Sequence, residues 1–358
     1  MFFKKALYAA VVVVGTYPVI LTLLCIPTLQ RELLFLNRIK FPFFVNYDRP
    51  EDLGLARGLR FGAKLKRTAF KVRNLYLSTS DGEKLGAWHV LPRTVYRQRH
   101  VGFDQAFSQR PTIIYLHGNA GTRATGYRVR TYSAMSSVLD CNVLAIDYRG
   151  FADSTGTPSE VGLVRDAQAA WDYVIERSNN RADIILVGHS LGTGVVSGLA
   201  GKLASEGISP KAIVLIAPFA SVRELLRLYR LFFVLPLLSP LKAFPKAQGG
   251  WYDDSAHSLD YLLNFFAYPF DSRTALQNVS CPVLIVNAKN DLSIPPIHSQ
   301  ILFNELNRRN ETVQRKGDDW GTISTFGDVV WFEGQHGGHN RIGVTEGTID
   351  LIADIAGL

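Results

Sequence analysis

The stretch Asp183-Ile184-Ile185-Leu186-Val187-Gly188-His189-Ser190-Leu191-Gly192-Thr193-Gly194 decides how the rest of the chain is interpreted. An apolar run typical of a buried strand ends in Gly-His-Ser-Leu-Gly, and helix-forming sequence follows it. This is the G-x-S-x-G pattern of a sharp strand-to-helix turn that leaves one serine at its tip. Gly188 and Gly192 relieve the crowding on either side of that turn. We therefore predict that Ser190 is a nucleophile and that the backbone N–H of Leu191 faces a developing oxyanion.

Strands alternate with helices on both sides of this stretch. Helices are predicted over 158–177, with Ser159 as the N-cap, and over 191–203. Apolar strands are predicted at 112–116, 142–146, 183–187, 211–217, 281–286 and 328–333. This alternation predicts an α/β fold with a mainly parallel central sheet and helices on both faces.

Two further strands, 72–79 and 84–91, surround an Asp-Gly turn and predict an antiparallel hairpin at one edge of the sheet. The polar stretch 93–110 is expected to be a surface loop. Residues 219–277 interrupt the alternation with prolines, glycines and aromatics, and an insertion of this length predicts a functional cap.

A serine nucleophile needs a base and a group that orients the base. In a sheet of this type both follow later strands, in the order serine, acid, histidine. Asp291 follows the strand sequence CPVLIVN, although its position alone would also suit an ordinary turn aspartate. His339 lies beyond the strand DVVWFEG, and His336 is its rival. Two glycines before His339 favour it, because they let the loop turn back over the site.

The turn His117-Gly118-Asn119-Ala120-Gly121 ends an earlier strand and predicts the second half of an oxyanion hole. The N–H of Asn119 is expected to act there together with the N–H of Leu191. We expect His117 to stabilise the loop, and His189 to pack beside Ser190 rather than act as a base.

The charge of the chain is concentrated at its N-terminal end. The first 73 residues hold 13 Lys and Arg against four acids, whereas the whole chain carries a net charge of +8. A basic segment at one end suits an anionic membrane surface better than nucleic acid. Because no nucleic-acid-binding signature accompanies it, nucleic acid is not an expected partner.

Ala6 to Leu29 is a stretch of 24 residues without a charge. Roughly 20 apolar residues span a bilayer core, so we predict a transmembrane helix. The long apolar run and the lack of a clear small-x-small cleavage site favour an uncleaved anchor over a signal peptide. The expected organisation is an anchor (1–30), a basic juxtamembrane segment (31–71) and a catalytic domain (72–358) with its cap (219–277). Within the second part, Leu33 to Val45 suits either an interfacial segment or one packed on the catalytic domain.

Three cysteines, Cys25, Cys141 and Cys281, are too few and too scattered for a disulfide framework or a zinc site. We expect buried apolar thiols, no metal and no cofactor.

The motifs around His117–Gly121, Asp147-Tyr148-Arg149-Gly150, Gly188–Gly192, Asp291 and His339 together resemble those of the α/β-hydrolase superfamily, from about Val72 to the C-terminus. The segments HGNAG, DYRGFADSTG and GHSLGTG and the N-terminal anchor are similar to one branch. It is the membrane-anchored α/β-hydrolase-domain-containing protein twelve group, which comprises lysophosphatidylserine lipases and monoacylglycerol lipases.

The resemblance implies a membrane-bound serine hydrolase that cleaves carboxylic esters of lipids, lysophospholipids or monoacylglycerols, at the endoplasmic reticulum membrane. Its partners would be the lipid substrate and the bilayer, while protein partners stay unknown. A thioesterase, a peptidase or an inactive scaffold on the same fold is the alternative.

The side of the membrane is open from the residues alone. Arg31, Arg38, Lys40 and Arg49 follow the anchor closely and favour a cytosolic domain by the positive-inside tendency. The resembled branch implies a lumenal domain, and the sequons at Asn278 and Asn310 would permit glycosylation there. We expect a single-pass protein with a lumenal catalytic domain.

Overall fold

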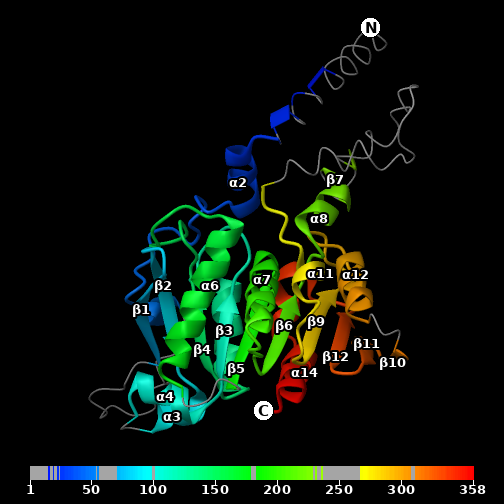
Figure 1. The fold of residues 1–358 in the computed structure, drawn as a ribbon. Helices are drawn as coiled ribbons and strands as arrows, with labels where there is room; N and C mark the ends of the chain where they lie inside the picture. The colour runs from blue at the N-terminus through cyan, green and yellow to red at the C-terminus, as the bar shows by residue number, and fades with distance from the viewer. Residues whose placement is uncertain are drawn as a thin grey trace, which may run out of the picture.

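The computed structural model describes residues 25–53, 71–98, 101–178, 183–228, 267–307 and 311–358, with isolated positions between 15 and 55 and between 230 and 236. Its centre is a ten-stranded sheet with the order β1-β2-β4-β3-β5-β6-β9-β12-β11-β10 (Figure 1). A separate pair of two-residue strands, β7 (Arg230–Leu231) and β8 (Leu235–Pro236), lies in the cap.

Six neighbouring strands of the sheet run parallel. They are β4 (Asn142–Ile146), β3 (Thr112–Leu116), β5 (Ile184–His189), β6 (Ala212–Ile216), β9 (Val283–Ala288) and β12 (Val329–Gly334). The first five are buried along their whole length, as strands covered on both faces must be. The predicted parallel sheet is therefore confirmed.

Antiparallel strands complete both edges of the sheet. β1 (Val72–Ser78) pairs with β2 (Lys84–Val90) around a turn in which Gly82 has φ +87°, as the Asp-Gly pair predicted. The opposite edge is a hairpin of β10 (Gln314–Gly317) and β11 (Gly321–Phe326), which the sequence analysis missed. All four residues of β10 are exposed, so no apolar pattern marks it.

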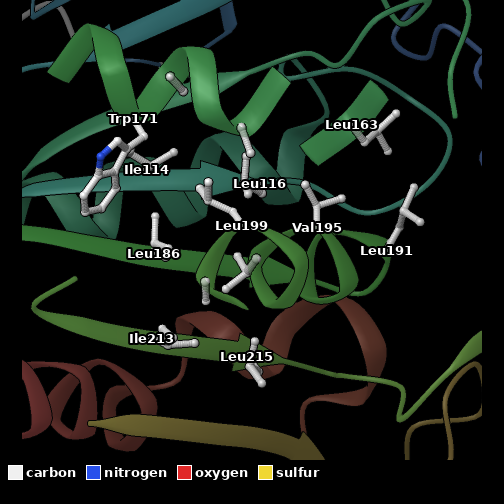
Figure 2. Packing of buried hydrophobic residues seen from close by; sticks show 14 of the residues in the cluster. Ile114, Leu116, Leu163, Trp171, Leu186, Leu191, Val195, Leu199, Ile213 and Leu215 are labelled. Atoms are coloured by element: carbon white, nitrogen blue, oxygen red, sulfur yellow. The ribbon is translucent and has the colours of Figure 1, made fainter. Parts of the chain in front are cut away.

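Helices cover both faces, as predicted. α6 (Glu160–Ile175) and α7 (Leu191–Ser205) pack on one face, and α5 (Gly126–Ser137) and α14 (Glu346–Ala356) pack on the other. Figure 2 shows side chains of α6 and α7 meeting those of β3 and β5 in the first of these layers, among them Leu163, Trp171, Val195, Leu199, Ile114, Leu116 and Leu186. The Ser159 hydroxyl caps α6 by accepting from the Gly162 N–H at 3.1 Å.

The prediction of a surface loop over 93–110 is wrong. This part of the chain forms α3 (Arg93–Arg97) and α4 (Phe103–Gln109), with residues 99 and 100 outside the described part. Val95, Ala106 and Phe107 are buried, so each short helix hides an apolar side that its polar residues masked in the sequence.

The remaining helices in the described part of the chain are short. They are α8 (Val222–Leu228), α11 (Ser272–Ala275), α12 (Ile297–Leu306), α13 (Gly338–Arg341), and the 3-10 turns η1 (Pro50–Leu53) and η3 (Ile342–Val344). α8, β7, β8 and α11 belong to the predicted cap, whose residues 237–266 lie outside the described part.

At the N-terminal end, α2 (Pro27–Phe35) lies on the catalytic domain and buries Gln30 and Phe35 (Figure 1). Among the residues that the structure describes, no helix is long and apolar enough to cross a membrane. Most of the predicted anchor, Ala6 to Leu29, falls outside those residues.

Candidate active site

Ser190 stands at the turn between β5 and α7. Its backbone adopts φ 53° and ψ −119°, a conformation that side-chain-bearing residues rarely accept. The turn is held by a hydrogen bond from the Ser190 N–H to the Ile216 carbonyl at 2.9 Å. A methyl group at Gly192 would overlap the Leu116 carbonyl oxygen, and one at Gly188 would overlap the carbonyl of Gly192. The tight turn inferred from the two glycines is therefore present.

Asp291 and His339 come together from two separate loops. The Asp291 carboxylate is nearly buried, and its Oδ2 lies 2.8 Å from His339 Nδ1. Its Oδ1 accepts from the backbone N–H groups of Ser293 (2.8 Å) and Ile294 (3.0 Å), which fixes its orientation. Because an ionised carboxylate can only accept, this contact assigns the proton of the neutral imidazole to Nδ1. The lone pair of His339 then lies on Nε2, as a general base requires.

The histidine loop is built as the glycines suggested. Gly337 has φ +123° and Gly338 has φ +54°, and the Gly338 N–H donates to the Asn290 side chain at 2.9 Å. His339 follows on α13, whereas the rival His336 is exposed. The structure thus brings His339, and not His336, to the acid.

His189 ties the serine turn to the histidine loop. Its Nε2 lies 2.8 Å from the backbone carbonyl of His339, and the two rings lie 5.0 Å apart. Burial, followed by repulsion from the His339 ring, holds the pKa of His189 well below its usual range. A neutral His189 that donates from Nε2 therefore joins the backbone of the histidine loop to the residue that directly precedes Ser190.

The loop after β3 lies directly against the serine. A Cβ placed on Gly118 would come within 3.1 Å of the Ser190 Cβ, so the loop passes the serine at close van der Waals distance. Asn119 follows and is exposed, while Leu191 begins α7. The first N–H groups of a helix carry partial positive charge and no partner within the helix. The two predicted oxyanion donors therefore come from segments that both adjoin Ser190.

Arg128 is a site residue that the sequence analysis missed. It is 1 % exposed, and its Nη2 donates to the carbonyls of Gly118 (3.0 Å), Asn119 (3.0 Å) and Ala120 (2.9 Å). Its Nη1 donates to the Thr122 carbonyl at 3.0 Å. One guanidinium thus donates hydrogen bonds to four backbone carbonyls of the loop. Nothing in the local sequence around Arg128 distinguishes it from a surface arginine.

Asp147-Tyr148-Arg149-Gly150 braces the same loop from behind. The Tyr148 hydroxyl donates to the His117 carbonyl at 2.8 Å, and Asp147 accepts from the Arg123 backbone N–H at 2.7 Å. Burial alone would raise the pKa of Asp147, but the Arg123 charge holds it below its ordinary value. An ionised Asp147 in a buried ion pair is therefore part of the frame of the site.

The described residues contain no group of three or more His, Cys, Asp or Glu side chains that could hold a metal ion. Cys141 and Cys281 are buried as predicted, and burial raises the pKa of each thiol to about 12. The prediction is wrong for Cys25, which is only half-buried. Both buried cysteines therefore pack as neutral apolar groups.

Comparison with known families gives one clear match: the model of the "Alpha/beta hydrolase family" matches residues 113–339. Curated relatives include the lysophosphatidylserine lipase ABHD12 of Danio rerio, 32% identical over 75% of this chain and 64% of the relative. The same-named protein of Rattus norvegicus is 33% identical over 82% of this chain and 67% of its own length. The chain thus spans about two thirds of the relatives that it matches.

Solved structures share the fold. An esterase from Pyrococcus furiosus superimposes with a TM-score of 0.54 at 16% identity, covering 88% of this chain and 96% of the esterase. An alpha-beta hydrolase from Vibrio vulnificus gives a TM-score of 0.52 at 16% identity, with 80% and 81% of the two chains covered. At such low identity these neighbours show the fold alone.

Proposed function

The chain belongs to the alpha/beta hydrolase family, and on that premise we propose that it hydrolyses carboxylic esters of lipids with Ser190 as the nucleophile. The observation that carries the proposal is the 2.8 Å contact between His339 Nδ1 and Asp291, from a histidine that His189 links to the serine turn. The name of the relatives, lysophosphatidylserine lipase, supports a lysophospholipid or monoacylglycerol as the substrate class.

In the proposed reaction, Ser190 Oγ attacks the ester carbonyl while His339 Nε2 takes its proton. Asp291 keeps the imidazole in the required tautomer and stabilises the charge that the ring gains. The carbonyl oxygen becomes an oxyanion that accepts from the N–H groups of Asn119 and Leu191. His339 then gives its proton to the departing alcohol, which leaves an acyl group on Ser190. Water, deprotonated by His339, attacks that ester and releases the fatty acid.

Purified full-length enzyme and a Ser190→Ala variant, incubated with a panel of monoacylglycerols and lysophospholipids, test the substrate class. We expect fatty-acid release from at least one lipid class by the parent and none above background by the variant. Cleavage of thioesters or peptides in place of lipid esters would reassign the substrate. Equal release by both proteins would contradict the proposal.

We also propose that a single N-terminal span attaches the enzyme to the endoplasmic reticulum membrane with its catalytic domain in the lumen. The 24 uncharged residues from Ala6 to Leu29 support the span. Asn278 is exposed, as a glycan acceptor must be. The protein should remain with membranes in alkaline carbonate. An endoglycosidase should reduce its apparent mass, and Asn278→Gln should remove part of that shift. A protein without any glycan on either sequon would argue for the cytosolic orientation.

A further inference from the structure

A cluster of exposed apolar side chains follows α2 on the same end of the molecule as the active site. Between residues 39 and 44, Ile39 is 47% exposed, Phe41 52%, Phe43 66% and Phe44 106%. Leu33, on α2, is 51% exposed. Single exposed apolar residues are ordinary, but several within one short segment mark an interaction surface. We call Ile39–Phe44 the aromatic turn.

The backbone of the aromatic turn is hydrogen-bonded to the catalytic domain, so the fold itself determines which of its side chains are exposed. The Ile39 carbonyl accepts from the Gly121 N–H at 2.7 Å, and the Phe41 carbonyl accepts from the Thr125 hydroxyl at 3.0 Å. Lys40 Nζ donates to the Ala152 carbonyl at 2.6 Å. Phe44 has φ +58°, a strained conformation for an aromatic residue. The fold therefore presents these rings outward.

The position of the aromatic turn in the chain indicates what covers it. The uncharged stretch that begins at Ala6 ends at Leu29, and the nine residues of α2 span only about 14 Å. A bilayer that holds this stretch would therefore lie within reach of the aromatic turn. Arg31, Arg38 and Lys40 are close by, against one acid, Glu32. Aromatic rings beside basic side chains suit the headgroup region of an anionic bilayer.

The same segment contacts the candidate oxyanion loop. The Phe35 carbonyl accepts from the Ala120 N–H at 3.0 Å, beside the 2.7 Å bond from Gly121 to Ile39. The carbonyls of this loop accept hydrogen bonds from Arg128. The N–H groups of Ala120 and Gly121 in the same loop donate to the segment that bears the aromatic turn. Figure 1 shows α2 above the central strands, at the end opposite the C-terminus.

We propose that the aromatic turn docks on the surface of an anionic phospholipid bilayer, with Phe41, Phe43 and Phe44 among the headgroups, and that its backbone supports the active-site loop. The consequence for lipid hydrolysis rests on the proposed function, whereas docking itself does not. Docking there would bring the loop beside Ser190 close to the surface from which a lipid substrate leaves the bilayer.

Tryptophan reporters test docking without reference to catalysis. Full-length Phe43→Trp and Phe44→Trp variants are placed in vesicles of phosphatidylcholine and phosphatidylserine whose acyl chains carry bromine near the headgroup. Val138→Trp is the matched control, because Val138 is 66% exposed at the end of α5, at the amino ends of the parallel strands. After subtraction of the parent signal, we expect bromine to quench the two reporters and to leave the control unchanged. Reporters quenched no more than the control would overturn the proposal.

A pair of kinetic assays tests the consequence. The double variant Phe43→Ser plus Phe44→Ser should lose about tenfold or more of its activity on a long-chain monoacylglycerol in vesicles, because lipid partitioning depends on buried apolar area. Its hydrolysis of a water-soluble short-chain ester should equal that of the parent. An unchanged vesicle activity, or an equal loss in both assays, would contradict docking through these rings. If the parent hydrolyses no ester at all, the proposed function is wrong. The quenching experiment would still decide whether the aromatic turn docks on the bilayer.

Discussion

At the scale of single residues, the serine turn requires glycines, because a side chain at these positions would clash with the backbone. Gly192 faces the Leu116 carbonyl so closely that Gly192→Ala must displace backbone. We expect this change to reduce the free energy of unfolding by about 3 kcal/mol and to abolish activity. Gly126→Ala is the matched control, because no atom lies within 4 Å of the added methyl. Chemical denaturation of both variants provides the measurement, and equal stabilities would refute the packing argument.

Arg128 offers a second test at this scale, as a positioning residue rather than a catalytic one. Arg128→Lys keeps the charge but cannot reach the four carbonyls that the guanidinium holds. We expect kcat to fall by about 10- to 100-fold with little change in KM, because a displaced oxyanion donor affects the transition state most. Arg130→Lys is the control, since Arg130 is exposed on the same helix. A change confined to KM would assign Arg128 to substrate binding instead.

At the scale of elements, α2 behaves as part of the catalytic domain. Phe35 is fully buried and lies edge-on against Tyr268 (5.3 Å) and Phe270 (6.2 Å), at the end of the cap. Phe35→Ala should therefore cost about 3–5 kcal/mol of stability, whereas Leu33→Ala, on the exposed side of α2, should cost little. Thermal unfolding in detergent compares the two. Equal midpoints for both variants would show that α2 does not pack on this domain.

The elements also show which parts of the fold and of the candidate site can be predicted from the sequence. Buried strands such as β3 and β5 were predictable because each holds an uninterrupted apolar run, and Ser159 was predictable because its side chain can accept a hydrogen bond at the start of a helix. The order of Ser190, Asp291 and His339 was readable because parallel strands end at one edge of the sheet. β10 was not predictable, because all of its residues are exposed and only its pairing with β11 makes it a strand. The contacts of α2 were not predictable because they join residues far apart in the chain, such as the Phe35 carbonyl and the Ala120 N–H. Arg128 was not predictable because its partners are backbone carbonyls, which leave no pattern in the sequence.

At the scale of the whole molecule, buried neutral histidines make the fold sensitive to acid. Burial lowers the pKa of His298 to about 4 and that of His89 to about 3, from 6.5 in an unfolded chain. Since the unfolded state binds these protons first, the stabilisation is complete above pH 6.5 and is lost as the pH falls toward 4. Within that pH range, each of the two histidines should lower the free energy of unfolding by up to about 1.4 kcal/mol per pH unit.

Urea denaturation at pH 7 and at pH 5 measures this effect. The parent should be less stable at pH 5, and His298→Phe should lose about 2 kcal/mol less than the parent between the two values. His336→Gln is the control for loss of a histidine at an exposed position. A His298→Phe variant with the full pH dependence would contradict the assignment.

The central claim is that Ser190, served by His339 and Asp291, is the nucleophile, and labelling by a fluorophosphonate probe tests it most directly. The full-length parent and Ser293→Ala, which removes an exposed hydroxyl beside Asp291, should both be labelled. Ser190→Ala should not be labelled at all, and His339→Ala should react at least about a thousandfold more slowly. Undiminished labelling of the Ser190→Ala variant would contradict the account.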